Sequence, residues 1–265
     1  MKRLFFLLFM AFSFTIFAQQ KINYKAVFQY KKIVDEKEKA RRDSLTKANP
    51  EMADVMKMIR KKFDNREFEM YFDKDESIYK QIHKLDAPTK TEGFSFKLPD
   101  HTLYKNIKEN EYVARSPLFQ ETYIVVDTLP DYHWKVTGES KKIGNYTVIK
   151  AEGVEKKKNW RTGKEKEVKI TAWFTPEIPI GNGPKKYHGL PGFIMELDKK
   201  GEVLLCKQIV VNPKDKKEIK QPDDGKKVSQ AEYEKIRKKM MEKMKKMYEN
   251  RRSDNRGGTR RIIIR

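Results

Sequence analysis

The sequence predicts an α+β protein built on a mostly antiparallel β-sheet, either a curved sheet or a partial barrel. A helical insertion after the first strand and a C-terminal amphipathic helix complete the predicted fold. Three observations lead to this prediction. Apolar and polar residues alternate in short segments that recur about every ten residues. Polar turn residues separate these segments, and apolar residues at helical spacing are confined to two stretches of the 265-residue chain.

The first 18 residues, 1–18, resemble a secretory signal peptide. Lys2 and Arg3 precede an apolar run, and Ala18 places a small residue at the expected cleavage position. The run is shorter than the roughly 20 apolar residues that a membrane-spanning helix needs. We therefore expect cleavage near Ala18, export to the periplasm or the cell surface, and no transmembrane segment in the mature chain.

The mature chain is predicted to begin with a strand and a helical insertion. Apolar side chains alternate with polar ones from Ile22 to Tyr30, which is typical of a half-buried strand. The pattern changes over residues 35–65, where Asn49 and Pro50 fit a helix N-cap followed by proline at the first helical position. Apolar residues follow at helical spacing: Met52, Val55, Ile59 and Phe63.

The alternation resumes after the insertion and continues to residue 211, the end of a predicted β domain of residues 19–211. The predicted strands are residues 68–72, 78–82, 102–107, 111–116, 121–127, 134–137, 140–143, 146–154, 168–174, 193–197 and 202–211. Cys206 lies in the last of them and is the only cysteine of the chain, so no disulfide can form within the chain. Its apolar surroundings favour a buried, unreactive thiol.

The loop between two of these strands concentrates the prolines and glycines of the chain. Residues 176–192 contain four of the eleven prolines and four of the thirteen glycines. Ordering a loop backbone costs about 1–2 kcal/mol per residue. Burial of Leu190 and Tyr187 recovers only roughly 1.5–3 kcal/mol each. Either backbone hydrogen bonds hold the loop in place, or its middle is mobile and only its C-terminal end docks on the domain.

The loop has a structural and a functional interpretation. In the structural one it is a rigid crossover between two strands, with Leu190 and Phe193 in the core. In the functional one it forms a surface for a ligand or a partner. The candidate binding residues are Trp173, Glu177, Tyr187, His188, Gly189, Leu190, Pro191 and Gly192.

The end of the loop resembles the signature of the GLPGLI family of exported bacterial proteins. Residues 189–194 read Gly-Leu-Pro-Gly-Phe-Ile, with Phe193 in the place of the second Leu of the family motif. The resemblance covers residues 23–211 approximately and is strongest over residues 171–198. The family pattern commonly carries a Cys near Val148, which this chain lacks. The resemblance implies an envelope location and defines no reaction.

Catalytic and metal motifs are sparse in the sequence. Glu177 and His188 flank the loop and could form a general acid–base pair, which is the one enzymatic hypothesis we retain. The four histidines show no metal-binding spacing, and residues 93–97 fail the GxSxG pattern at their last position. We expect no cofactor and no metal site.

The C-terminal region is predicted to be separate from the β domain. Residues 212–228 read as a polar linker, and residues 229–250 as an amphipathic helix that opens with a capping box at Ser229 and Glu232. Residues 251–265 read as a basic disordered tail. The net charge of +21 suggests attraction to anionic surfaces. The helix either packs its Tyr/Ile/Met stripe on the domain or lies on a membrane or a partner.

These observations favour an exported, non-enzymatic envelope protein that binds a ligand or a partner. The alternatives are a hydrolase that uses Glu177 and His188, and a protein that associates with an anionic surface through its basic C-terminal helix and tail. The expected partner is an envelope or outer-membrane protein or an anionic surface, and nucleic acid is not expected because the chain is exported and lacks a recognisable binding module.

Overall fold

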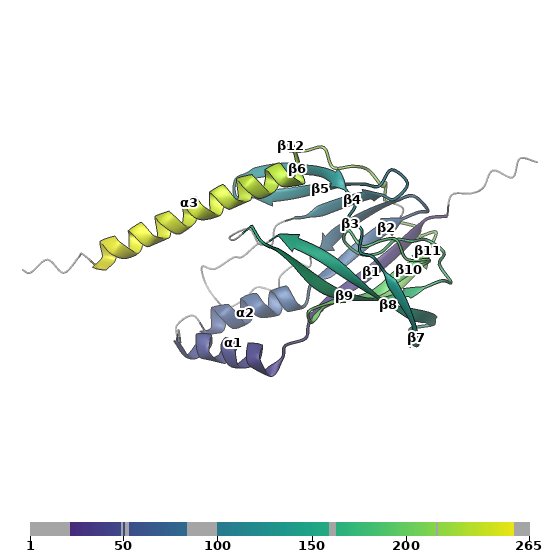
Figure 1. Cartoon of the computed structure of the whole chain (residues 1–265), viewed down its shortest axis with the longest axis horizontal. Coiled ribbons are helices and arrows are strands. Elements are labelled where there is room, and N and C mark those ends of the chain that lie inside the picture. The colour runs from purple at the N-terminus through teal and green to yellow at the C-terminus, as the bar shows by residue number, and fades with distance from the viewer. Residues whose placement is uncertain are drawn as a thin grey trace, which may run out of the picture.

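The computed structural model describes residues 22–48, 50, 53–83, 100–158, 163–215 and 217–256, which form one open twelve-stranded sheet and three helices (Figure 1). The strands are β1 Tyr24–Lys32, β2 Glu67–Phe72, β3 Glu76–Ile82, β4 Thr102–Asn106, β5 Glu111–Leu118, β6 Glu121–Thr128, β7 Lys135–Ile143, β8 Tyr146–Lys158, β9 Glu165–Thr175, β10 Phe193–Lys199, β11 Glu202–Val211 and β12 Lys226–Ser229. The helices are α1 Glu36–Ala48, α2 Ala53–Asp64 and α3 Gln230–Arg256. The predicted signal peptide lies outside the described residues.

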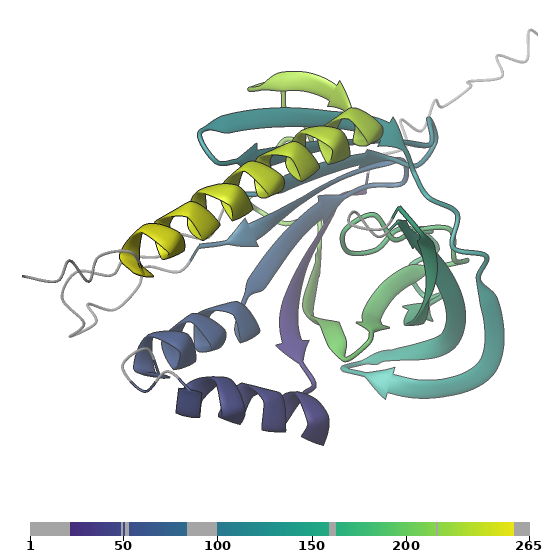
Figure 2. The same ribbon diagram turned by 60° about the vertical axis from the view of Figure 1, so that its left-hand side comes forward.

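The sheet consists of two antiparallel meanders that meet at β1. The strand order is β12-β6-β5-β4-β3-β2-β1-β11-β10-β9-β8-β7, so β1 lies between the first strand of one meander and the last strand of the other. β1 and β11 pair from Tyr24 with Val211 to Lys32 with Glu202. The described pairs are antiparallel except that of β12 with β6. The prediction of a mostly antiparallel sheet is confirmed, and Figure 2 shows that its β7–β10 end curls strongly.

The main core lies on the inner face of this curved sheet. Alternate residues of β1, β2 and β10 meet there, and Phe72 stacks on Phe193 with ring centroids 4.4 Å apart. The ring of Phe28 also packs against Phe193, with ring centroids 6.0 Å apart. A smaller core lies at the other end of the same face, where α3 covers β6. The alternation of apolar residues along each strand produces these faces, because successive side chains point to opposite sides of a sheet.

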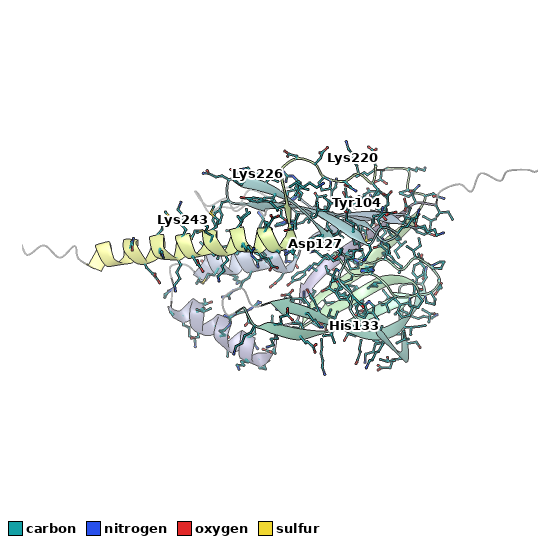
Figure 3. The ribbon with its side chains drawn as sticks, turned by 45° about the horizontal axis from the view of Figure 1, so that its top comes forward. Tyr104, Asp127, His133, Lys220, Lys226 and Lys243 are labelled. Atoms are coloured by element: carbon teal, nitrogen blue, oxygen red, sulfur yellow. The ribbon has the colours of Figure 1, made fainter. Side chains whose placement is uncertain are left out.

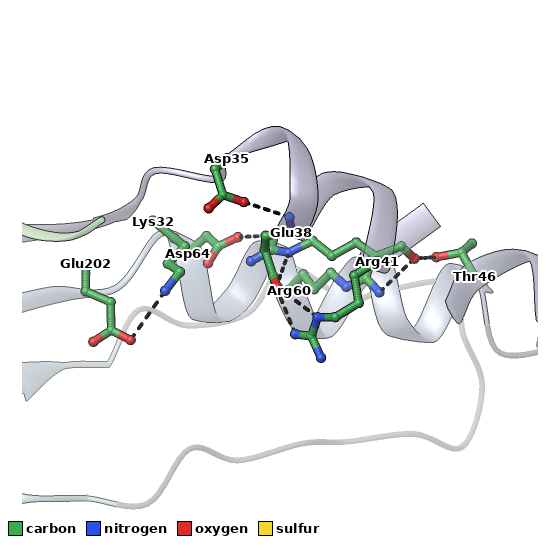
Figure 4. Close-up of polar contacts among 9 residues, drawn as sticks. Lys32, Asp35, Glu38, Arg41, Thr46, Arg60, Asp64 and Glu202 are labelled. Carbon is green, nitrogen blue, oxygen red and sulfur yellow. Dashed lines mark hydrogen bonds and ion pairs between the residues drawn. The ribbon is translucent and has the colours of Figure 1, made fainter. Parts of the chain in front are cut away.

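The helical hairpin α1–α2 follows β1, as predicted. Asp35 caps α1, because its Oδ1 accepts the backbone N–H of Glu38 at 2.7 Å. The predicted N-cap at Asn49 lies outside the described residues. Arg42 joins the two helices, since it contacts Glu38 at 3.1 Å on its own helix and Asp64 at 3.5 Å on α2 (Figure 4 labels the two acidic residues). Hydrogen bonds from Arg41 and Arg42 lower the pKa of Glu38 to about 2.

The segment that the sequence predicts as a linker crosses the outer face of the sheet. We call residues 212–215 and 217–225 the strap. Asp215 accepts hydrogen bonds from Lys25 of β1 and, at 3.0 Å, from Tyr71 of β2. Farther along, Ile219 packs on β4–β6 and Asp224 pairs with Arg115 at 3.3 Å. The strap then continues into β12, which pairs with β6 in parallel, so residues 226–229 extend the sheet (Figure 3 labels Lys220 and Lys226 on this side).

The predicted C-terminal helix is confirmed and is longer than residues 229–250. The capping box forms, because the Ser229 N–H donates to Glu232 Oε2 at 2.9 Å and the Glu232 N–H donates to Ser229 Oγ at 3.2 Å. Helix α3 continues to Arg256 and so includes the first residues of the predicted tail; residues 257–265 lie outside the described part of the chain. Within the described residues, no helix is long and apolar enough to cross a membrane.

Candidate functional site

The Pro/Gly-rich loop connects β9 to β10 and is held by its own backbone. The Gly189 N–H donates to Gly181 O at 2.9 Å, and the Phe193 N–H donates to Ile178 O at 3.0 Å. Asn182 pairs with His188 in an isolated antiparallel bridge, which draws the two arms of the loop together. Of the two possibilities that the energetics of the loop leave open, backbone hydrogen bonding is therefore the one found.

A buried lysine from another strand anchors the middle of the loop. Lys105 of β4 has no exposed surface, and its Nζ donates to Gly183 O at 2.7 Å and to Tyr187 O at 3.0 Å. Within the described residues Lys105 forms no ion pair. Desolvation by burial lowers the pKa of Lys105 well below its usual value of 10.5. A neutral amine has two N–H groups, which match the two loop carbonyls.

Gly192 and Gly183 let the loop approach neighbouring backbone and side chains closely. A Cβ on Gly192 would lie 2.2 Å from the carbonyl oxygen of Thr175, and a Cβ on Gly183 would lie 2.7 Å from Ile194. Leu190 and Phe193 are buried, with exposed fractions of 3% and 0%. The structural interpretation of this end of the loop, with both side chains in the core, is confirmed.

Tyr187 lies inside the molecule. Its ring packs on Tyr132 at 4.8 Å between centroids, and its hydroxyl donates to Glu155 at 3.2 Å. Burial, together with the charge of Glu155, raises the pKa of Tyr187. Trp134 covers the adjoining turn, and its Nε1–H donates to His188 O at 2.8 Å. These contacts make Tyr187 a core residue, and a partner could reach it only if the loop moved.

The two side chains of the acid–base hypothesis have separate partners. His188 Nε2 lies 3.2 Å from Pro130 O, whereas Glu177 Oε1 accepts the Thr147 N–H at 2.8 Å. Both side chains lie in the described part of the chain, and no hydrogen bond or ion pair joins them. Desolvation by burial is the main cause that lowers the pKa of His188, to about 4. A neutral imidazole at pH 7 is the consequence.

The remaining candidate binding residues lie toward the surface. Trp173 is half-buried, and the Lys141 ammonium lies 4.2 Å from the centre of its ring while also pairing with Glu196 at 2.6 Å. Gly189 and Pro191 are exposed. Residues 163–215 and the other described ranges contain no group of three or more His, Cys, Asp or Glu that could hold a metal ion. The binding role of the loop remains a prediction.

A cavity of about 420 Å³ lies where the strap meets the ends of the first strands. Tyr24, Tyr71 and Phe72 line it from β1 and β2, and Lys217 and Ile219 line it from the strap. Local sequence patterns do not reveal this cavity, because residues almost 200 positions apart form its walls.

A second feature that sequence reasoning did not anticipate is the distance to which α3 projects. Tyr233 packs edge-on against Tyr123 with ring centroids 5.8 Å apart, and Ile236 joins the same small core. Farther along the helix, Met241, Met244 and Met247 have exposed fractions of 45%, 48% and 51%. Beyond its first turns, α3 extends past the sheet (Figures 1 and 2).

Comparison with known proteins gives a short family match and a distant structural likeness. Residues 153–196 match a family described as "Protein of unknown function (Porph_ging)", over a stretch that includes β9 and the loop. The match does not carry the name GLPGLI, so that resemblance remains a prediction. No curated protein matches the chain.

Two solved structures are similar to the chain at 16% sequence identity. They carry the titles "Structure of PNGF-II in C2 space group" and "Structure of PNGF-II in P21 space group", with TM-scores of 0.47 and 0.46. Each alignment covers 81% of this chain, and 32% and 33% of the respective PNGF-II chains. The chain therefore spans about a third of the length of these structural neighbours.

Proposed function

We propose that this chain is an exported, non-enzymatic binding protein of the cell envelope, in which the curved sheet is the base and α3 is the interaction arm. The observation that carries the proposal is the division of α3 into two parts. Its first turns pack on β6 and β12, while three methionines farther along are about half exposed. Methionine side chains are flexible and polarisable, and they are used at surfaces that bind other molecules.

The way in which α3 is attached supports this role. The strap holds the start of the helix to the sheet by a route that crosses β1, β2 and β5, and β12 pairs four of its residues with β6. A helix of 27 residues is about 40 Å long at 1.5 Å per residue. An arm fixed at one end in this way can present its far half to a partner while the sheet keeps its core intact.

The loop belongs to the base in this proposal. Lys105, Tyr187 and Leu190 are buried together, and the candidate pair Glu177 and His188 is separated by different hydrogen-bond partners. A change in the loop is therefore expected to alter stability before it alters binding.

The proposal is tested by sedimentation of the purified mature chain with a bacterial envelope fraction. A chain that ends at Lys238 lacks the last 18 of the 27 residues of α3, and a chain that ends at Arg256 keeps the whole helix. We expect the longer chain to sediment like the full protein and the shorter chain to remain in the supernatant. Equal sedimentation of both chains, with equal melting temperatures, would show that α3 is not the interaction arm.

A further inference from the structure

All three helices lie toward one end of the molecule. Helix α3 and the α1–α2 hairpin extend to the same side of the sheet in both views, and the curled β7–β10 region lies at the other end (Figures 1 and 2). We call α1, α2 and α3 together the helical end. This arrangement brings segments about 170 or more residues apart in sequence into one region of the surface.

The helical end is basic on every helix. Helix α1 has five basic and three acidic residues, α2 has four and two, and α3 has ten and five, which together give an excess of nine positive charges. Lys57 and Lys61 of α2 are exposed, and Lys243 projects from the part of α3 beyond the sheet (Figure 3). A positive surface of this kind attracts an anionic partner and repels a second copy of itself.

The projecting part of α3 combines these charges with an apolar stripe. At 100° per residue, Met247, Met244 and Met241 follow one another at 60° steps, beginning on the side of the helix that carries Tyr233 and Ile236. Lysines border this stripe on both sides: Lys239 and Lys243 on one, Lys245 on the other. Long lysine side chains beside a half-exposed apolar stripe can reach charged groups while the stripe enters an apolar layer.

We propose that the helical end docks on a membrane leaflet rich in acidic phospholipid, with Met241, Met244 and Met247 entering the interface. This inference rests on the proposed role of α3 as the interaction arm and names its partner. The helix lies on the surface and does not span it, since no helix in the described residues is long and apolar enough to cross a membrane. Charge complementarity selects the acidic leaflet, because neutral lipid offers nothing to nine excess positive charges.

The basic residues and the methionines should affect vesicle binding in different ways. Each basic residue close to an acidic surface strengthens binding about fivefold. Each methionine that enters the interface strengthens it further through the burial of methylene groups. Charge should therefore decide which vesicles bind, and the methionines should decide how tightly they are bound.

The test is sedimentation of the full mature chain with vesicles of pure phosphatidylcholine and with vesicles of phosphatidylcholine and phosphatidylglycerol in a ratio of about 7:3. We expect binding to the acidic vesicles to be at least about twentyfold stronger than to the neutral ones in dilute salt, and to disappear in concentrated salt. Equal binding to both vesicles, or no binding to either, would overturn the inference.

Variants separate charge from insertion. The triple variant Met241→Gln, Met244→Gln and Met247→Gln keeps the charge and is expected to bind acidic vesicles about tenfold more weakly. The matched triple change to Leu should bind like the wild type. The three methionines are about half exposed, so circular dichroism should show both variants folded. Equal binding of the Gln and Leu variants would refute insertion of the methionines.

A second pair of variants tests whether the whole helical end docks. Lys57→Gln with Lys61→Gln on α2 should weaken binding severalfold, whereas Lys135→Gln with Lys142→Gln on β7 removes the same charge at the other end and should not. Equal effects of the two pairs would show that only net charge matters.

If envelope fractions bind through α3 while acidic vesicles do not, the lipid inference fails, the proposed function stands, and the partner is a protein.

Discussion

Replacement of Lys105 by Met tests the account of the loop most directly. Met keeps most of the length and volume of the side chain and removes the amine that donates to Gly183 O and Tyr187 O. Both carbonyls then lose a donor in a buried place, at a cost of about 1–3 kcal/mol each. The variant also avoids a cost of folding, because the wild type must deprotonate and desolvate Lys105 when it folds.

The balance between these effects depends on pH. Burial lowers the pKa of Lys105 in the folded state well below its usual 10.5. At a pH between the pKa of Lys105 in the folded state and its pKa in the unfolded state, the unfolded chain binds more protons. The free energy of unfolding therefore rises with pH by up to about 1.4 kcal/mol per pH unit. The contribution of Lys105 to the free energy of unfolding is largest once the pH reaches the pKa of the unfolded state. Relative to Lys105→Met, the wild type should therefore gain stability as the pH rises toward 10.

Urea denaturation of both proteins at pH 7, 8, 9 and 10 measures this gain. We expect the wild type to be more stable by about 2–4 kcal/mol at pH 10, and the difference to shrink or change sign at pH 7. Lys186, whose pKa burial lowers to about 8, titrates in the same window but is present in both proteins, so its contribution cancels. A difference between the two proteins that does not vary with pH would refute the burial of an uncharged Lys105.

Four single substitutions and one titration test the packing of the loop and of the core. Gly192→Ala should destabilise the fold by more than about 3 kcal/mol, because its Cβ would lie 2.2 Å from a backbone oxygen. The control Lys185→Ala should change the free energy of unfolding by less than about 1 kcal/mol. Equal melting temperatures of the two variants would contradict this prediction. Tyr79→Phe should leave stability unchanged or raise it by about 1 kcal/mol, because the Tyr79 hydroxyl is buried without a hydrogen-bond partner among the described residues, while Tyr104→Phe should lower it, because Tyr104 donates to a carboxylate. The ring of His188 should titrate near pH 4 by NMR. Because the pKa of His188 in the folded state lies below the usual 6.5, its contribution to stability should fall as the pH drops from 6.5 toward 4. A titration midpoint near 6.5 would place the imidazole in solvent.

Local sequence patterns were sufficient for most of the elements. The alternation between Ile22 and Tyr30 located β1, and the helical spacing after Pro50 located α2, because burial on one face imposes a period on the chain wherever an element lies on a core. Ser229 and Glu232 marked the start of α3, because a capping box satisfies backbone groups within four residues.

The strap shows where local patterns end. Residues 212–228 are polar and carry two prolines, which is the composition of a linker, yet this segment is fixed to β1, β2, β5 and β6. Each of its contacts joins positions about 100 or more residues apart. Polar segments become ordered when distant groups complement them, and a sequence read along its length does not contain that information.

The Pro/Gly-rich loop divides in the same way. Residues 176–192 could be assigned from their composition alone to a constrained connection between two strands, because proline restricts the backbone conformation and glycine permits conformations that other residues rarely adopt. What the loop covers depends on contacts with distant strands. The register of β3 and β4 places Lys105 opposite Ser77 on the inner face, and the curvature of the sheet brings the loop over both. A lysine is buried there because two carbonyls from a distant segment reach its amine, and no feature of its own strand could have required it.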